Sequence, residues 1–420
     1  MKLKGILGYC ITLLAVPTLA AINRTVLLHP LPEKVITVVP DLMLAILFAK
    51  AFFWRYVRGG FRFTIPDLLA VIVFLYSAAL SFLDPGNGIL GFRISGARIL
   101  LYFTVRLEGD GQETSLGTRS DEARYMLAIS KILVVVGVLG YLVVCVLPEK
   151  AALAWYKANS FVIGYYAGVR RMDSIFWSPV AFGAAMAFAS LIFFDAFLKA
   201  SRRGVRLRSL AAFLFLSSCN LLSMSRGAWV YEAAGALVLL ALYRDKLRSL
   251  ALALLAVIVL GSLVVSSDSL KRQMSSILST TEAGTGQIPR YNQRKEGIAS
   301  VLENPLGYGV GSSGYIGARD HGPIKAVTDN WYIKTAQELG VVGLALYLAL
   351  FVALITATAG TRLISNLRPQ AFYLAIISGF LLEAYGSNIF DFDFMGGVFW
   401  IATGFAMNTV NSNSPETLNA

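Results

Sequence analysis

Four arginine residues have positions and neighbours that suggest phosphate chemistry: Arg170, Arg171, Arg226 and Arg290. Arg226 is the clearest case, because it separates two apolar runs at a Ser-Arg-Gly step. An arginine at the edge of apolar segments costs free energy unless a partner compensates its charge. A guanidinium group is a planar fork that matches phosphate oxygens. Converging arginines would therefore suit a lipid-linked diphosphate, whose charge they could stabilise as it leaves. Alternatively, Arg226 simply extends toward lipid headgroups.

Other polar residues with chemical potential lie late in the chain. His321, Asp329 and Asn330 precede an apolar run that begins near residue 333. Asp329 stands where a helix N-cap would stand, which is a purely structural alternative for this residue. Further on, Asp391-Phe392-Asp393 has the spacing of a DxD metal site. This short pattern is common by chance, and we expect no metal there.

The segment from Pro305 to Gly314 is rich in glycine. Glycine lets the backbone come close to a ligand, and successive N–H groups in such a run can approach a phosphate. No Gly-Lys-Ser/Thr follows, so the run is not a nucleotide-binding P-loop. The spacing leaves two interpretations open, a plain loop or a loop that touches a ligand.

The elements that position these residues must lie largely in a membrane. The 420 residues are 56% hydrophobic and only 15% charged, and the mean hydropathy is +0.64. Soluble chains carry about 25% charged residues, so this chain lacks the polar residues to cover several globular surfaces. The composition predicts an all-α polytopic membrane protein. It excludes a disordered scaffold, a secreted disulfide-linked domain and a conventional nucleic-acid binder, in spite of the formal charge of +12.

Runs of about 20 apolar residues predict about twelve transmembrane helices. Lys and Arg concentrate at the N-terminus and in every second connection, near 55–62, 119–124, 199–208, 244–248 and 362–368. Basic residues in short loops stay in the cytoplasm, so both termini are expected there. A retained first helix is favoured over a cleaved signal peptide, because its apolar stretch is long. The expected spans are 5–22, 36–53, 66–83, 88–106, 127–147, 178–198, 208–224, 227–243, 248–266, 333–359, 370–388 and 394–411.

Two of the predicted periplasmic segments are unusually long. The segment 148–177 is aromatic and is expected to lie in the membrane interface. The segment 267–332, between spans 9 and 10, is large enough for a small helical domain. The predicted organisation is a bundle of spans 1–9 over 1–266, a periplasmic loop domain over 267–332, and spans 10–12 with a cytoplasmic tail over 333–420. Arg93 and Arg98 fall inside the fourth span, where they either pair with carboxylates such as Asp41 or Asp84 or line a lipid entry path.

Several short motifs, taken in order, resemble a known family. They are Arg171 with Ser174, Phe176 and Pro179; Ser225-Arg226-Gly227; Arg290 with Glu303-Asn304-Pro305 and the following glycines; and Asp329-Asn330-Trp331-Tyr332 with Glu338-Leu339-Gly340. With about twelve spans and a late periplasmic loop, the chain resembles the O-antigen ligase/polymerase superfamily of bacterial envelope glycosyltransferases over essentially its whole length. Arg294 departs from it, since the family often has an aromatic residue there.

The resemblance implies transfer of a glycan from undecaprenyl diphosphate to an acceptor hydroxyl at the periplasmic face, without a metal or another cofactor. It implies that Arg171, Arg226 and Arg290 hold the diphosphate, with Arg170 as a substitute for Arg171. Asn330 and Tyr332 are expected to support the site. Ligases of the family usually carry a histidine directly before the asparagine, where this chain has Asp329. Asp329 is therefore the preferred general base, and His321 is the alternative.

The predicted function is that of a polysaccharide polymerase in the bacterial inner membrane, with its active site facing the periplasm. It would join lipid-linked repeat units into an exopolysaccharide or an O-antigen-like chain. A ligase that passes the glycan to a lipid or protein acceptor is the first alternative, and a flippase for lipid-linked sugars is the second; a receptor or scaffold has no sequence feature in its favour beyond the large loop. The expected partners are undecaprenyl-diphosphate-linked oligosaccharide, the bilayer, and a chain-length regulator or export machinery, but no nucleic acid.

Overall fold

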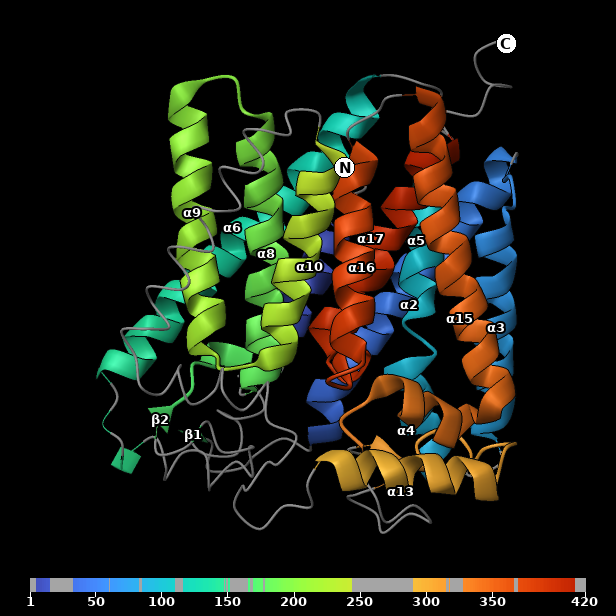
Figure 1. The fold of residues 1–420 in the computed structure, drawn as a ribbon. Coiled ribbons are helices and arrows are strands. Elements are labelled where there is room, and N and C mark those ends of the chain that lie inside the picture. The colour runs from blue at the N-terminus through green and yellow to red at the C-terminus, as the bar shows by residue number, and fades with distance from the viewer. Residues whose placement is uncertain are drawn as a thin grey trace. The chain divides into compact units, whose positions relative to one another are not determined.

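The computed structural model shows two compact units, each assembled from segments that are distant in sequence (Figure 1). The first combines Met1–Trp54 with Gln112–Leu270, and the second combines Arg55–Gly111 with Lys271–Ala420. The structure describes residues 5–15, 33–59, 61–82, 85–109, 116–146, 148, 150–151, 165–166, 169–176, 178–243, 290–314, 317, 328–365 and 369–411.

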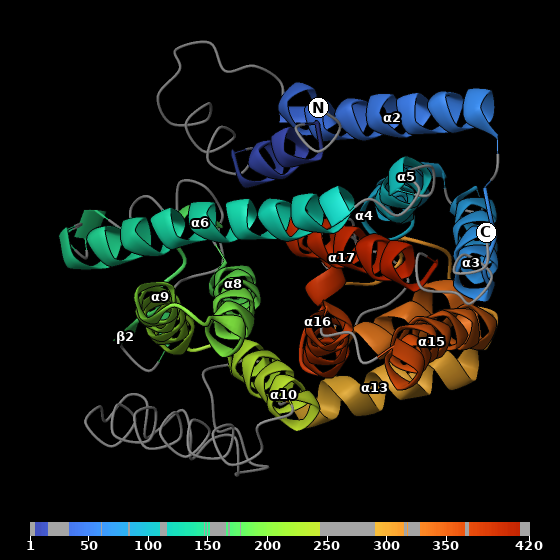
Figure 2. The same cartoon turned by 90° about the horizontal axis from the view of Figure 1, so that it is seen from above.

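The first unit is built around α8 (Pro179–Lys199), which packs against α6, α9 and α10 (Figure 2). Ser178 caps α8 by accepting a hydrogen bond from the Ala181 N–H, and Pro179 occupies the first helical position, where its missing N–H is not needed. Small residues along α8 allow its neighbours to approach closely, as transmembrane helix packing requires. The other elements are α2 (Glu33–Arg58, which ends at the start of the second unit), α6 (Leu116–Val146), β1 (Tyr165–Tyr166), β2 (Val169–Arg170), η1 (Ser174–Phe176), α9 (Arg203–Leu222) and α10 (Arg226–Leu242).

The second unit has α15 and α17 at its centre. Helix α15 packs against α3, α13, α16 and α17, and α17 also packs against α5. Aromatic rings of Trp331, Phe351, Phe390 and Phe399 meet between these helices, with centroid separations from 4.6 Å for Trp331–Phe390 to 5.8 Å. Its elements are α3 (Ile65–Ser81), α4 (Pro85–Ser95), α5 (Ile99–Gly109), α13 (Arg290–Glu303), α15 (Trp331–Ser365), α16 (Pro369–Ala384), η2 (Ile389–Asp391) and α17 (Asp393–Asn411).

A buried ion pair ties three helices of the second unit. The Arg106 Nε and Nη2 donate to the two carboxylate oxygens of Asp67 at 2.9 and 2.8 Å, and both side chains are 0% exposed. The Tyr102 hydroxyl and the Thr64 backbone N–H and hydroxyl also donate to Asp67. Arg106 Nη1 donates to the Asn408 side-chain oxygen at 2.8 Å. The network therefore joins α3, α5 and α17, and every polar atom of the ion pair has a partner, as a buried charge requires.

The helices confirm an α-helical membrane protein. Among the described residues, four helices are long and apolar enough to cross a membrane: Arg124–Val146, Pro179–Lys199, Arg203–Leu222 and Trp331–Gly360. A fifth span arises if Asn87–Ser95 and Ile99–Gly109, which meet at 42°, are counted together. The predicted fourth span is thus broken near Gly96–Arg98. The expected ninth span, 248–266, lies outside the described residues, and the twelve crossings, their orientation and the predicted domain boundaries stay predictions.

Candidate functional site

In the first unit, the chain turns sharply between α9 and α10 at the Ser225-Arg226 step. The N–H of Ser223 bonds to the carbonyls of Cys219 and Asn220, and Met224 has a positive φ of 50°, which ends α9. Ser225 is the N-cap residue and Arg226 is the first residue of α10. The turn therefore places Arg226 where two apolar helices meet, and only Ser223, Met224 and Ser225 separate these helices.

Arg171 is held at this same turn. Its Nε donates to the carbonyl of Ser223 at 2.8 Å and its Nη2 donates to the carbonyl of Met224 at 3.2 Å. The Met172 N–H donates to the Leu222 carbonyl at 3.0 Å, so the segment after β2 is fixed to the C-terminus of α9. A cation suits this position, because the last carbonyls of a helix carry partial negative charge. The structure thus brings Arg171 and Arg226 to one turn, with Arg170 at the end of β2 immediately before it.

A hydrogen-bonded carboxylate, Glu232, which sequence reasoning missed, joins α9 and α10 next to the turn. Glu232 of α10 accepts hydrogen bonds from the Ser217 hydroxyl and from the Asn220 side-chain amide, the latter at 2.6 Å. The Trp229 indole N–H donates to the Asn220 carbonyl at 3.1 Å. These contacts fasten α10 to α9 one to two turns beyond Arg226. A carboxylate inside an apolar run was the available signal, because such a residue needs partners within the membrane.

In the second unit, the predicted site residues gather at the start of α15. Asn330 is the helix cap, since its side-chain oxygen accepts from the Ile333 N–H at 3.1 Å. The suggestion that Asp329 is the helix N-cap was therefore wrong by one residue. Asp329 is exposed and directly precedes the cap residue. The Tyr332 hydroxyl donates to the Leu381 carbonyl of α16 at 2.6 Å. Arg290 is the first residue of α13, but its side chain is outside the described part of the chain, as is all of His321.

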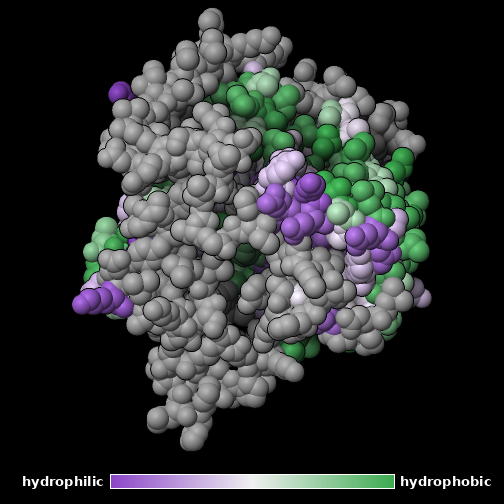
Figure 3. All heavy atoms as spheres, turned by 60° about the horizontal axis from the view of Figure 1, so that its bottom comes forward, coloured by the Kyte–Doolittle hydropathy of each residue, from purple (hydrophilic) through white to green (hydrophobic). Residues whose placement is uncertain are grey.

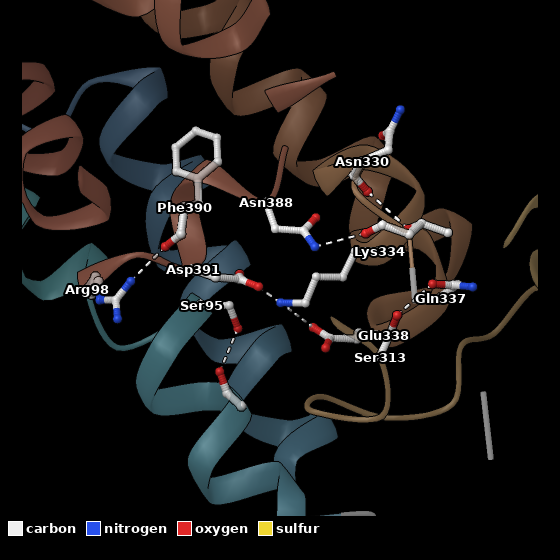
Figure 4. A network of polar contacts seen from close by, with 12 residues as sticks. Ser95, Arg98, Ser313, Asn330, Lys334, Gln337, Glu338, Asn388, Phe390 and Asp391 are labelled. Atoms are coloured by element: carbon white, nitrogen blue, oxygen red, sulfur yellow. Dashed lines mark hydrogen bonds and ion pairs between the residues drawn. The ribbon is translucent and has the colours of Figure 1, made fainter. Parts of the chain in front are cut away.

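The same end of α15 carries a buried charge cluster that the sequence analysis did not propose. The Lys334 ammonium lies 2.8 Å from an Asp391 carboxylate oxygen and 3.5 Å from a Glu338 oxygen (Figure 4). The Lys334 and Glu338 side chains are each 4% exposed, and that of Asp391 is 16% exposed. Lys334 and Glu338 are four residues apart and therefore share one helix face. The spacing of Lys334 and Glu338 at the start of an apolar run could have predicted this cluster from the sequence.

The two carboxylates of the DxD-like motif have different cationic partners. Asp391 pairs with Lys334, whereas Asp393 pairs with Arg98, whose Nη1 also donates to the Phe390 carbonyl at 2.6 Å (Figure 4). Both carboxylates are therefore used to join α4–α5, α15 and α17. Arg98 thus pairs with a carboxylate, as one of the two expectations had it, and that carboxylate is Asp393, because the break between α4 and α5 turns Arg98 toward the start of α17. Asp84 lies outside the described residues.

The glycine-rich run forms a packed loop. The N–H groups of Tyr308 and Gly309 donate to the carbonyls of Gln337 and Glu338, and the Val341 N–H donates to the Pro305 carbonyl. These bonds are possible because α15 is interrupted at Gly340, whose φ is 71° and ψ is −179°. A Cβ on Gly307 would lie 2.4 Å from the Gly340 nitrogen. Glycine is thus required at position 307 by backbone contact, and the alternative of a loop that touches a ligand stays a prediction.

Helix α13 is fastened across this loop. Gln337 donates to the Ser300 hydroxyl of α13 at 2.8 Å and accepts from the Ser313 hydroxyl at 2.6 Å. Near the N-terminal end of α13, the Arg294 guanidinium lies 4.5 Å from the ring centroid of Tyr385, beyond the end of α16. Figure 3 brings the α13 side forward and shows hydrophilic and hydrophobic side chains next to one another there. Arg294 therefore has a defined contact with Tyr385, although its role was unclear from the sequence.

Comparison with known proteins adds one finding to this geometry. A search of curated proteins gives no match to the chain. A sequence model of the family described as O-antigen ligase matches residues 211–348. The matched residues run from α9 through the Ser225-Arg226 turn and α13 to the first part of α15, and so contain Arg226, Arg290 and Asp329. The segment 211–348 is therefore similar to the O-antigen ligase family, which confirms the resemblance of this membrane protein to the O-antigen ligase/polymerase superfamily.

Proposed function

We propose that this protein is a polysaccharide polymerase of the bacterial inner membrane. It takes a glycan linked to undecaprenyl diphosphate and transfers it to a sugar hydroxyl of another lipid-linked repeat unit at the periplasmic face. Members of the matched family are membrane glycosyltransferase-like enzymes, which supports transfer of a lipid-linked oligosaccharide. The lengthened product is then an exopolysaccharide or an O-antigen-like chain.

The observation that carries the proposal is the turn between α9 and α10. Arg171 is locked onto the carbonyls of Ser223 and Met224, directly before Arg226. The Arg171 guanidinium is thus fixed at the end of apolar helices, and Arg226 begins the next helix at the same turn, where a lipid diphosphate would enter from the bilayer. Fixed donors aimed at developing negative charge cost little reorganisation when the leaving group departs. Arg170, directly before Arg171, would add to this positive set, and Arg290 is a further candidate for the diphosphate by the family resemblance alone.

In the proposed step, the acceptor hydroxyl oxygen attacks the anomeric carbon of the donor sugar. The bond between that carbon and the diphosphate oxygen breaks, and the diphosphate leaves with the bonding electrons. The hydroxyl proton passes to a general base, for which Asp329 is the first choice because it is an exposed carboxylate beside the cap of α15. His321 is the alternative. The arginines stabilise the departing diphosphate.

A ligase remains the second candidate, because the matched family is described as O-antigen ligase and the donor chemistry is shared. The two reactions differ in their product. A polymerase gives a ladder of increasing glycan lengths on the lipid, whereas a ligase gives a single transfer to a different acceptor. Aspartate in place of the histidine that ligases usually carry supports the polymerase.

The test is reconstitution of the purified protein in proteoliposomes with lipid-linked repeat units as the only glycan. The products are released by mild acid and separated by size. A ladder of repeat units supports the polymerase. Transfer that occurs only after a second acceptor, such as lipid A, is added would replace the polymerase with the ligase.

A further inference from the structure

The turn that follows α16 contains an unusual concentration of unpaired oxygen atoms. Four buried side-chain oxygens between Glu383 and Asn388 have no hydrogen-bond partner in the part of the chain that the structure describes: Glu383 Oε1 and Oε2, Ser387 Oγ and Asn388 Oδ1. Glu383 is 0% exposed. A buried carboxyl group without partners costs several kcal/mol, and buried polar groups in native proteins are nearly always paired. These oxygens therefore indicate that a partner from outside the chain completes the site.

The backbone brings these side chains to one place. The Glu383 carbonyl accepts from the N–H groups of Gly386 and Ser387 at 2.8 and 3.0 Å, so the helical turn continues past the end of α16. Ser387 therefore follows Glu383 at the spacing of one helical turn. Asn388 follows at once, and its amide is oriented by donating to the Thr328 carbonyl at 2.9 Å. Its oxygen is thereby the atom left for an external donor.

The chemistry of these atoms selects the partner. Carboxylate and amide oxygens only accept hydrogen bonds when the carboxyl group is ionised, and a hydroxyl can do either. A diphosphate also presents acceptor oxygens and would be repelled. The hydroxyl groups of a sugar are donors and match the set. An exposed aromatic ring stands at the same turn, since Tyr385 is 56% exposed and carries Arg294 against its ring.

We propose that Glu383, Ser387 and Asn388 form a subsite for the hydroxyl groups of the acceptor sugar, with Tyr385 at its outer edge. The subsite adjoins the candidate catalytic residues, because Asn388 bonds to Thr328, the neighbour of Asp329. The proposal rests on the proposed function and deepens it by assigning residues to the acceptor sugar. The arginines would bind the donor diphosphate, and the turn after α16 would bind the acceptor hydroxyls.

The test measures sugar binding separately from glycan lengthening. The probe is the lipid-free repeat-unit oligosaccharide, released by mild acid from the organism's own lipid-linked material, and its Kd for the full-length protein in detergent is measured by calorimetry. Glu383→Gln keeps the size of the side chain but replaces one acceptor oxygen with an amide donor, and we expect its Kd to rise at least tenfold. Glu383→Leu is expected to melt no lower than wild type, because it removes an unpaired group, and to bind no sugar.

Gln370 supplies a matched control at the other end of the same helix. It is equally buried, and neither of its side-chain polar atoms has a partner among the described residues. Gln370→Leu is expected to leave the Kd unchanged. An unchanged Kd for Glu383→Gln, or no sugar binding by the wild type, would overturn the subsite. The subsite would also be overturned, in favour of a cation site, if NaCl or MgCl2 alone raised the melting midpoint of the wild type and did not raise that of Glu383→Gln.

The same preparations distinguish this failure from failure of the proposed function. If wild-type protein makes no glycan ladder but binds the oligosaccharide through Glu383, the polymerase is wrong and the subsite stands. If it makes a ladder while Glu383→Gln binds sugar as well as wild type does, the polymerase stands and the subsite is wrong.

Discussion

Replacing Arg106 with leucine removes one half of the buried ion pair that joins α3, α5 and α17. Asp67 then loses its counter-charge and two donors, at 2.9 and 2.8 Å, while both side chains are 0% exposed in the folded protein. A hydrogen bond to a charged group contributes about 1.5–3 kcal/mol, and breaking a buried pair costs about 3–5 kcal/mol. Tyr102 and Thr64 still donate to Asp67, so we expect the lower end, about 3 kcal/mol.

The assay is reversible unfolding in mixed micelles, with the SDS fraction as the denaturing variable and tryptophan fluorescence as the readout. Arg106→Leu should lower the free energy of unfolding by about 3 kcal/mol. The double variant Arg106→Leu with Asp67→Asn should recover part of that loss, because no uncompensated charge stays buried; Asp67→Asn alone completes the cycle. Arg208→Leu is the matched control, since Arg208 is exposed on α9, and it should change stability by no more than about 0.5 kcal/mol.

The reasoning would be refuted if Arg106→Leu unfolded within about 0.5 kcal/mol of wild type. It would also be refuted if the double variant were as unstable as the sum of its single changes, because residues in direct contact should not be additive.

Three further predictions concern the turn and the helix that hold the site. Gly340→Ala should lower the free energy of unfolding by about 2 kcal/mol, because φ is 71° and the new Cβ would lie 2.5 Å from the Leu306 carbonyl carbon. In the same unfolding assay Gly360→Ala, which meets nothing within 4 Å, should be neutral or stabilising. Lys334→Met should cost about 3 kcal/mol in that assay, since it leaves two buried carboxylates without a cation; wild-type stability would contradict the cluster. Arg171→Lys should slow glycan lengthening at least about tenfold in proteoliposomes, because an ammonium group cannot hold both carbonyls as a guanidinium does; an unchanged rate would contradict the role of the turn.

Much of the helical content follows from the sequence because it depends on local hydrophobicity. The helix ends at Pro179 and at the Ser225-Arg226 step agree with the expected boundaries within a few residues. The break between α4 and α5 shows where this approach stops. Hydropathy averages over the whole span, whereas the break depends on Arg98 reaching Asp393 and Phe390, nearly 300 residues away.

The site residues divide in the same way. The position of Arg226 at a break between two helices was predictable, because an arginine between two apolar runs costs free energy unless it lies near the membrane surface or a partner. The partner of Arg171 was not, because it is a pair of backbone carbonyls that appear only when α9 ends at Leu222. Lys334, Glu338 and Glu383 each left a local signal, a charge within an apolar run. Lys334 and Glu338 lie in an ion-pair cluster, whereas the Glu383 side chain has no hydrogen-bond partner among the described residues. This difference depends on tertiary packing.

The central claim is that arginines bind the donor diphosphate during glycan lengthening. The most direct measurement compares wild type, Arg226→Ala and Arg290→Ala in proteoliposomes with lipid-linked repeat units, with Arg208→Ala as a control of equal charge. The account predicts a glycan ladder from wild type and Arg208→Ala, and a rate at least about 100-fold lower from the other two, the loss expected when a transition-state charge contact is removed. Ladders of wild-type length and rate from Arg226→Ala and Arg290→Ala would contradict it.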